Sequence, residues 1–186
     1  MKRLRMFINR NVHFFEEHNF YFNELRLLDW HKYSGESLPS NFFGKNLVVL
    51  RMPQSQLKGL EGVQNFSNMT IMNFCDCEFL RKIPDVSRIP NLEKLALDYC
   101  KNLVEVHPSV GFLDKLVSVS LEQCTNLRSF LRSLRMRSLK LLRLPGCSRL
   151  KNFLEIECQM ECLKEIDFSE TGIKELPSSI GYLIGV

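Results

Sequence analysis

The sequence lacks any apolar run long enough to cross a membrane. A spanning helix needs roughly 18–20 consecutive apolar residues, whereas runs such as Leu47–Leu50 are far shorter. The N-terminal segment Met1–Arg10 begins with positive charge, but only three apolar residues follow before polar residues return. This pattern does not match a secretory signal peptide. We therefore expect an intracellular protein in the cytoplasm, with the nucleus as the alternative.

The sequence also lacks an even set of cysteines and a strong charge of either sign. Its seven cysteines are an odd number, which argues against a closed disulfide framework and favours a reducing compartment. The net charge of +4 is too small to indicate a nucleic-acid or membrane partner by itself. The apolar fraction of 45% is enough to fill a core within the 186 residues, so a folded chain of one or two domains is expected.

Catalytic and metal-binding patterns are missing as well. The four histidines are scattered and suggest no serine, histidine and acid arrangement. His13 and His18 are five residues apart, which on a helix places their rings roughly 140° from each other instead of on one face. Cys158 and Cys162 have no second pair, and we interpret them as small apolar residues. We expect no catalytic, cofactor or metal site, and no enzymatic activity.

What the sequence does contain is a repeated frame of apolar residues. Each copy has apolar residues at positions 1, 4 and 6, and most copies have a small residue at position 9 and an apolar residue at position 12. The starts step by 22, 22, 23, 24, 23 and 24 residues. They lie near Leu25, Leu47, Met69, Leu92, Leu116, Leu139 and Leu163.

The two ends of this frame are less regular. Residues 1–24 are expected to form a degenerate N-terminal repeat or lead-in, in either of two registers. One register uses Leu4 and Phe7, and the other uses Met1, Leu4 and Met6. Val186 falls 23 residues after Leu163, so the repeats should fill residues 25–186 and the chain should end as a further repeat begins.

The spacing of the frame predicts a solenoid. Positions 4 and 6 alternate with more polar neighbours, as expected for a short strand with one face inward. One repeat cannot bury its apolar side alone, so repeats stack and their strands pair in parallel at about 4.8 Å. We predict an α/β fold, a leucine-rich repeat solenoid in a horseshoe arc, with short parallel strands on the concave face. Irregular or short helical return segments form the convex face, including the proline-started, serine-capped turns at 108–113 and 177–183.

In the six copies from Leu47 onward, position 9 is occupied by a small residue that can form a hydrogen bond, whereas the copy at Leu25 has Tyr33 there. At this position the chain turns inward, and such a side chain can satisfy backbone groups freed where the strand ends. The predicted structural ladder consists of Ser55, Cys77, Cys100, Cys124, Cys147 and Thr171.

Positions 2, 3, 5, 7 and 8 are expected to line the concave face. A sheet roughly 29 Å across seven strands would suit a protein partner better than a small molecule. Tyr99 is the preferred anchor because aromatic residues often dominate interface energies, although ordinary surface packing is the alternative. The candidate contact residues are Arg26, Asp29, Lys32, Arg51, Gln54, Asn73, Asp76, Glu93, Lys94, Asp98, Tyr99, Ser118, Ser120, Glu122, Gln123, Lys140, Arg143, Lys164, Glu165, Asp167 and Glu170.

A basic stretch lies between residues 128 and 140. Its apolar members, such as Phe130 and Leu134, are expected to face the core while the cations remain in solvent. Docking on an acidic partner or on nucleic acid is the alternative, with nucleic acid the less favoured. The cations are Arg128, Arg132, Arg135, Arg137 and Lys140.

Three segments resemble the leucine-rich repeat region of plant intracellular immune receptors that carry a TIR domain and a nucleotide-binding domain. They are Asn23–His31, Leu38–Phe42 and cysteine-marked repeat ends such as Cys100–Leu103, and the similarity covers essentially the whole chain. The resemblance implies a module that recognises pathogen effectors and holds the receptor inactive. The implied partners are a pathogen effector or the receptor's own nucleotide-binding domain.

The sequence departs from the complete receptors in two respects. Around Gly44-Lys45, Pro39 stands where a P-loop would begin with glycine, and Asn46 replaces the required serine or threonine. The chain also has no room for a TIR domain, so neither ATPase nor NAD-cleaving activity is implied. The alternative function is a free-standing cytosolic repeat scaffold, or a truncated receptor relative, that binds another protein.

Overall fold

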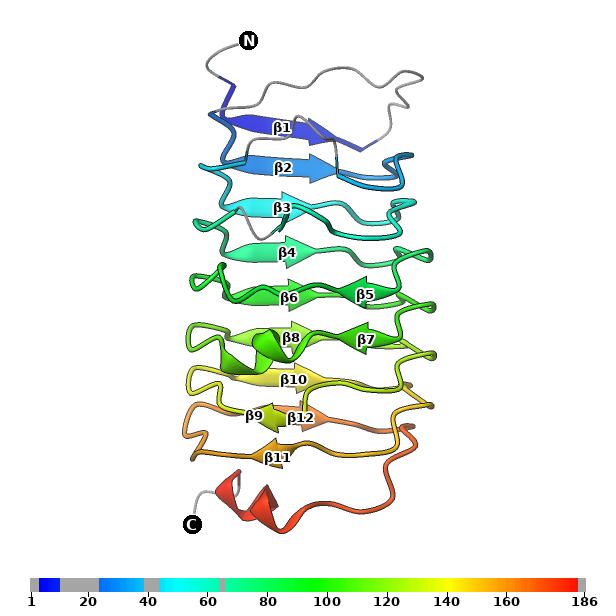
Figure 1. The fold of residues 1–186 in the computed structure, drawn as a ribbon, viewed down its shortest axis with the longest axis vertical. Helices are drawn as coiled ribbons and strands as arrows, with labels where there is room; N and C mark the ends of the chain where they lie inside the picture. Colours follow the sequence, from blue (N-terminus) through cyan, green and yellow to red (C-terminus); the bar gives the residue numbers. More distant parts are fainter. Residues whose placement is uncertain (1–3, 11–23, 39–43, 64–65, 184–186) are drawn as a thin grey trace.

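The structure is a computed structural model that describes residues 4–10, 24–38, 44–63 and 66–183. Within these residues, eight short strands form one parallel sheet in the order β1-β2-β3-β4-β6-β8-β10-β12 (Figure 1). The strands are β1 Met6–Asn9, β2 Leu27–Trp30, β3 Val49–Arg51, β4 Ile71–Asn73, β6 Lys94–Ala96, β8 Ser118–Ser120, β10 Leu141–Arg143 and β12 Glu165–Asp167.

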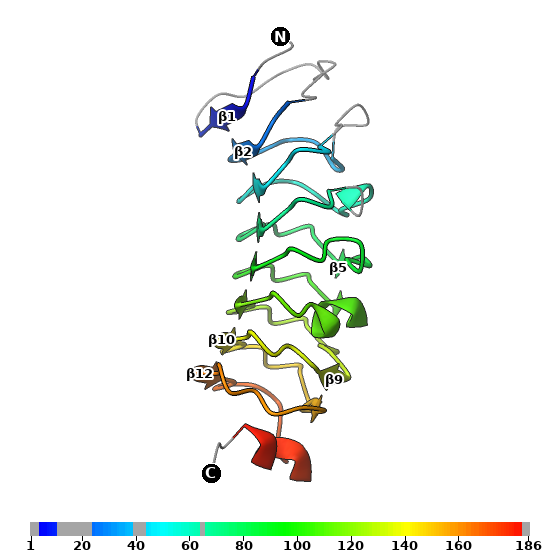
Figure 2. The same ribbon diagram turned by 90° about the vertical axis from the view of Figure 1, so that its left-hand side faces the viewer.

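The return segments lie on the opposite side of the stack. They contain two small parallel pairs, β5 (Lys82–Ile83) with β7 (Glu105–Val106) and β9 (Ser133–Leu134) with β11 (Glu155–Ile156). The described residues of these segments also include the 3-10 helices η2 (Pro108–Phe112) and η3 (Ser178–Tyr182). Figure 2 shows that the stack bends so that the eight-stranded sheet lies on its inner side. The predicted solenoid is therefore confirmed.

The core follows the repeated frame. Leu92, Leu95 and Leu97 hold positions 1, 4 and 6 of one repeat and are at most 1% exposed. The parallel register places Leu95 opposite Met72 on one side and Val119 on the other, so equivalent side chains stack in rows. Burial of these rows is the main stabilising contribution, because a single repeat has no core of its own.

The register of the first repeat follows from the pairing of β1 with β2. Phe7 lies opposite Leu28, and Met6 lies opposite Leu27. Phe7 therefore holds position 4 and Leu4 holds position 1, which selects the first of the two registers that the sequence left open.

The two helical turns are present at the predicted places, but the prediction that serines cap them is wrong. His107 caps η2, since its Nδ1 accepts a hydrogen bond from the amide of Ser109 (3.2 Å), and η3 has no side-chain cap. The Ser109 hydroxyl instead accepts from the amide of Val86 in the preceding repeat (2.9 Å). Ser179 does the same with the amide of Ile156 (3.1 Å). Both serines thus join repeats.

Other features singled out in the sequence have these positions. Phe130 and Leu134 are buried in the stretch 128–140, while its five cations are exposed. Cys158 packs half-buried against the core, and Cys162 is exposed. His13 and His18 lie outside the described residues, as do residues 39–43 of the resemblance segment. In the part of the chain that is described, no helix has the length and apolar character to span a bilayer.

Candidate functional site: the concave sheet surface

The parallel register arranges the outward side chains of the main sheet in rows. At position 5, Arg51 lies opposite Asn73, and further along the sheet Arg143 lies between Ser120 and Asp167. Every predicted concave residue except Asp29 has an exposed or half-exposed side chain. The sheet therefore presents one continuous surface, and contact of these residues with a partner stays a prediction.

Asp29 corrects that prediction, because its side chain is only 3% exposed. The Arg10 guanidinium lies 3.1 Å from Asp29 Oδ2, and His31 Nε2 lies 2.9 Å from Oδ1. Oδ1 has no further partner among the described residues. A buried carboxylate needs such compensation, so Asp29 joins the first two repeats and is not part of the contact surface.

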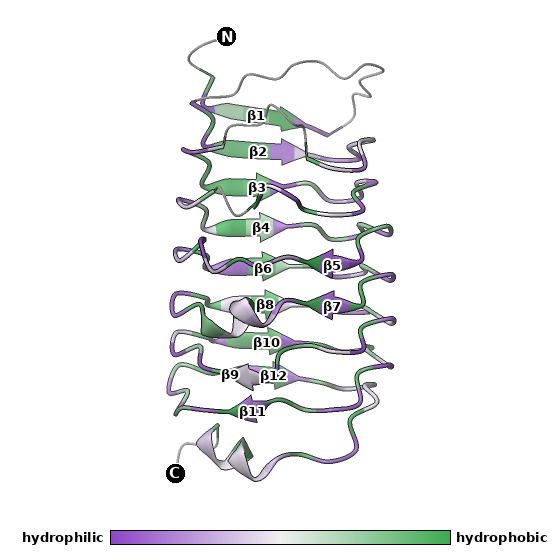
Figure 3. Cartoon of the chain, in the orientation of Figure 1, coloured by the Kyte–Doolittle hydropathy of each residue, from purple (hydrophilic) through white to green (hydrophobic). Residues whose placement is uncertain are grey.

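The candidate contact residues predicted from the sequence do not include an apolar strip at position 3 of the first four strands. Met6, Leu27, Val49 and Ile71 lie opposite one another in register across β1 to β4. Met6 is 56% exposed, and the other three are half-buried on the same surface. Figure 3 shows the change from apolar β2 to β4 to the more polar β6. The strip was detectable in sequence, since position 3 was already assigned to this face.

A hydrogen-bonded network occupies the polar middle of the surface. Asp98 Oδ1 accepts from the Ser120 hydroxyl and from the amide of Glu122 (2.9 Å). The Cys75 thiol donates to Asp98 Oδ2 over 3.7 Å. Burial, followed by the charge of Asp98, raises the pKa of Cys75 to about 12. The thiol therefore stays protonated at neutral pH, and Asp98 links three repeats.

Tyr99 is held rigidly beside this network. Its backbone has φ 62°, and its amide donates to the Glu122 carbonyl over 2.7 Å. Its hydroxyl donates to Glu122 Oε1 over 2.9 Å, and this bond raises the pKa of Tyr99. The ring remains 41% exposed. Tyr99 is thus an ordered aromatic side chain at the centre of the surface, which lowers the entropic cost of contacting a partner.

The left-handed backbone of Tyr99 is a property of position 8 in the described repeats. Non-glycine residues with φ between 55° and 62° occur at Lys32, Gln54, Asp76, Tyr99, Gln123 and Glu170. The amide of Gln54, for example, donates to the carbonyl of Cys75 in the next repeat (2.8 Å). This bond compensates a conformation that L-residues rarely adopt. It also fixes where the adjacent side chains of the surface point.

Directly after the surface, the chain turns inward at the position-9 ladder. The thiols of Cys77, Cys100, Cys124 and Cys147 each donate to a position-6 carbonyl of the preceding repeat, over 3.1–3.2 Å. Ser55 differs because its hydroxyl accepts from the amide of Tyr33, and Thr171 bonds Phe168 within its own repeat. Burial raises the pKa of Cys77 to about 11. Cys77 is therefore neutral at physiological pH, and the four thiols act as hydrogen-bond donors in the core.

The burial of the thiols predicts their reactivity. In native protein, one thiol should react rapidly with a disulfide reagent such as DTNB, because Cys162 alone is exposed among the seven free cysteines. Cys75 and Cys158 are half-buried and should react slowly, and all seven should react after denaturation. Cys162→Ser should remove the fast phase. Three or more fast thiols in native protein would contradict the buried ladder.

The repeated frame, the parallel sheet and the inward-turning ladder define a leucine-rich repeat solenoid. Its concave surface is broad and open, with apolar residues on β1 to β4 and a polar network from β4 to β8. Within the described ranges, no group of three or more His, Cys, Asp or Glu side chains could hold a metal ion. The arrangement is suited to contact with a macromolecule.

Known proteins with similar sequences are plant disease resistance proteins. The chain is 37% identical to Disease resistance protein RPS6 of Arabidopsis thaliana over 159 residues, which are 85% of this chain and 14% of that protein. It is 33% identical to TMV resistance protein N of Nicotiana glutinosa over 181 residues, which are 97% of this chain and 16% of the relative. No family model matches the chain.

The chain is therefore a homologue of one segment of plant disease resistance proteins, and the resemblance stated from its sequence is confirmed. It spans about one sixth of the length of these relatives or less.

Proposed function

We propose that the chain is a protein-binding leucine-rich repeat module of an intracellular plant immune receptor, and that its concave surface is the binding site. The observation that carries this proposal is the strip of Met6, Leu27, Val49 and Ile71, aligned on an open sheet that also presents the hydrogen-bonded side chain of Tyr99. Apolar and aromatic residues at the centre of a contact with charged residues around it are typical of protein interfaces.

The size and shape of the surface support a protein partner. Eight strands at about 4.8 Å spacing extend roughly 34 Å from β1 to β12. A surface of this length is large enough to provide the area of about 800 Å² that each partner buries in a standard protein interface. The charges at its two ends differ. Arg26, Lys32 and Arg51 lie near the first strands, whereas Glu165 and Glu170 lie near the last. A partner of complementary charge would therefore bind in one orientation.

The partner in this proposal is a pathogen effector or the nucleotide-binding domain of the same receptor. Binding of the nucleotide-binding domain would hold the receptor inactive, and binding of the effector would release the receptor from this inactive state. The chain itself performs no catalysis in this proposal and acts in the cytoplasm. The names of the relatives, which are resistance proteins, support the role in defence.

Site-specific photo-crosslinking tests which face binds. Benzoylphenylalanine is introduced in place of Tyr99 on the concave face or in place of Phe112 on the convex face, and the chain is expressed in plant cells. Both are exposed aromatic residues, at 41% and 51% respectively, so they are a matched pair. We expect crosslinking from position 99 to an effector or a nucleotide-binding domain, identified by mass spectrometry. Position 112 should give no crosslink to the same partner.

Affinity measurements with the captured protein complete the test. Tyr99→Ala should weaken binding about tenfold or more, as removal of a central aromatic contact does, while Phe112→Ala should leave the affinity unchanged. Equal crosslinking from both positions, or capture from position 112 alone, would contradict the assignment of the face. Capture of an unrelated cytosolic protein at position 99 would instead favour the scaffold alternative.

A further inference from the structure

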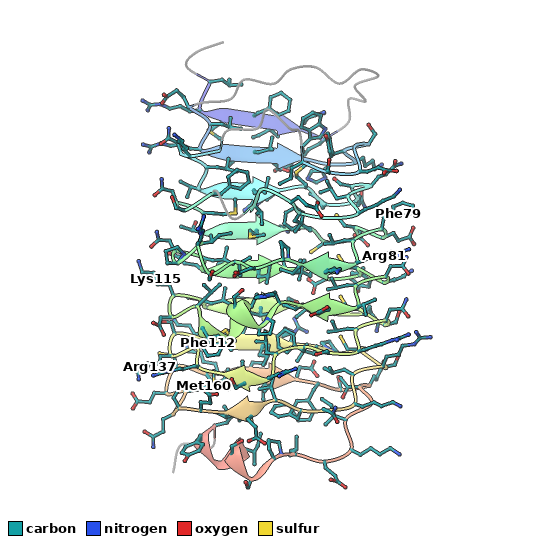
Figure 4. All side chains as sticks on the ribbon, viewed as in Figure 1. Phe79, Arg81, Phe112, Lys115, Arg137 and Met160 are labelled. Atoms are coloured by element: carbon teal, nitrogen blue, oxygen red, sulfur yellow. The ribbon has the colours of Figure 1, made fainter. Side chains whose placement is uncertain are left out.

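A second surface feature lies outside the concave face, at the edge of the stack where the main strands end. It is a hollow of about 200 Å³. Figure 4 shows Arg81 on this edge, pointing away from the stack. The hollow is lined by Arg81, Asn102, Val104, Asn126, Arg128 and Arg149. These residues come from four consecutive repeats, so the solenoid alone brings them together.

The backbone positions two of the arginines on either side of a small residue. The amide of Val104 donates to the Arg81 carbonyl (2.8 Å), and the amide of Arg128 donates to the Val104 carbonyl (3.1 Å). The three residues therefore hold equivalent positions in successive repeats. Because valine is much shorter than arginine, the side chains of Arg81 and Arg128 extend further from the backbone than Val104 does, and all three residues line the hollow.

Two asparagines also line the hollow. Asn102 Nδ2 donates to the Glu78 carbonyl (2.9 Å), and Asn126 Nδ2 donates to Asn102 Oδ1 (3.3 Å). This ladder aligns the corner of each repeat with the next. Arg149 follows at the same position of the next repeat, since it lies two residues after Cys147 as Asn126 lies two residues after Cys124. Arg149 and Arg128 both line the hollow.

The described residues provide no ion-pair partner for the three guanidinium groups. Among the described residues, ion pairs involve Arg10, His31, Lys58, His107 and Arg143, and none of the three arginines of the hollow. Glu78 and Glu105 are near them in sequence but pair with none of them. Three like charges around one hollow repel each other, and a bound anion would remove this repulsion. Guanidinium groups bind both phosphate and carboxylate oxygens through paired hydrogen bonds. Three positive charges favour an anion with more than one negative charge, such as a phosphate.

We propose that this hollow binds a small anion carrying one or two phosphate groups. Its volume of about 200 Å³ is below the roughly 300–1,000 Å³ of pockets for drug-sized ligands, so it suits a diphosphate or a phosphate headgroup and not a whole nucleotide. The three arginines hold the phosphate oxygens, and Val104 and Asn126 also line the hollow. This site is independent of the concave surface and does not rest on the proposed protein binding.

Titration calorimetry with pyrophosphate tests the proposal, with orthophosphate and sulfate compared at matched ionic strength. The test variant is R81Q/R128Q/R149Q. The control is R88Q/R135Q/R137Q, which removes the same charge from exposed arginines outside the hollow, including Arg137 on the opposite edge in Figure 4. We expect one pyrophosphate per chain, binding at least about tenfold weaker in the test variant and nearly unchanged in the control. Side-chain amide signals of Asn102 and Asn126 should shift in NMR spectra of the wild-type chain.

A vesicle arm separates a free phosphate compound from a lipid. Phosphatidylcholine vesicles containing phosphatidic acid should not sediment the wild-type chain if the ligand is a free compound, whereas sedimentation that depends on the three arginines would assign the phosphate to a lipid headgroup. Equal weakening of pyrophosphate binding in both triple variants would show a general charge effect and overturn the proposal. The proposal would also be overturned if the wild-type chain bound pyrophosphate with a dissociation constant above about 1 mM and did not sediment with the vesicles.

Discussion

Replacing Leu97 by aspartate should unfold the repeats around it. Leu97 holds position 6 of its repeat and is 0% exposed, and its carbonyl accepts the thiol of Cys124. The substitution removes apolar packing and buries a carboxylate with no cation beside it, at a cost of about 3–5 kcal/mol. In a chain of this size we expect the melting temperature to fall by about 10 °C or more, measured by circular dichroism.

Asp98→Asn is the control for this prediction. Asp98 is adjacent in the chain but half-exposed, and its Oδ1 accepts from Ser120 and from the amide of Glu122. The asparagine amide keeps an oxygen that can accept both bonds, so the substitution removes only the charge and the long bond of 3.7 Å from the Cys75 thiol to Oδ2. We expect a change in melting temperature of less than about 2 °C. Equal melting temperatures of the two variants would show that the inside and outside assignments are wrong.

The architecture was predictable because it is set by a period. Apolar residues recur in every repeat at the positions that Leu92, Leu95 and Leu97 hold in one of them. Stacking the repeats in parallel buries all of these residues together. The same logic assigned position 3 to the concave face. The apolar strip that includes Val49 and Ile71 lies on this face, but candidate contact residues selected mainly for their polarity do not include it.

Features that join one repeat to another through particular polar side chains were not predictable from the period of the apolar residues. Asp29 was placed on the surface, but Arg10 and His31 pair with it and bury it. Ser109 was assigned to its own turn, yet its hydroxyl reaches the amide of Val86 some 23 residues earlier. Each of these contacts depends on which side chains happen to be neighbours across repeats, and a frame of apolar positions contains no information on that.

The glycine of the first helical turn should be one of the least replaceable residues on the convex face. Gly111 lies in η2, and a Cβ built there would be 2.6 Å from the carbonyl oxygen of Ser133 in β9. The carbonyl of Gly111 also accepts the amide of Arg135 over 2.9 Å. Gly111→Ala should therefore push β9 away from η2, at a cost of about 1–3 kcal/mol. We expect a fall in melting temperature of about 5 °C, and faster amide exchange at Arg135.

Gly181→Ala provides a matched control, because Gly181 holds the same place in η3 and a Cβ there would meet nothing within 4 Å. Alanine is a better former of helical turns than glycine, so this variant should be neutral or about 0.5 kcal/mol more stable. Both substitutions have the same chemistry in the same kind of turn, and they differ in whether a neighbouring described repeat packs on the glycine. A loss of stability in Gly181→Ala equal to that in Gly111→Ala would mean that the turn itself requires glycine, and the close approach of β9 would not be the cause.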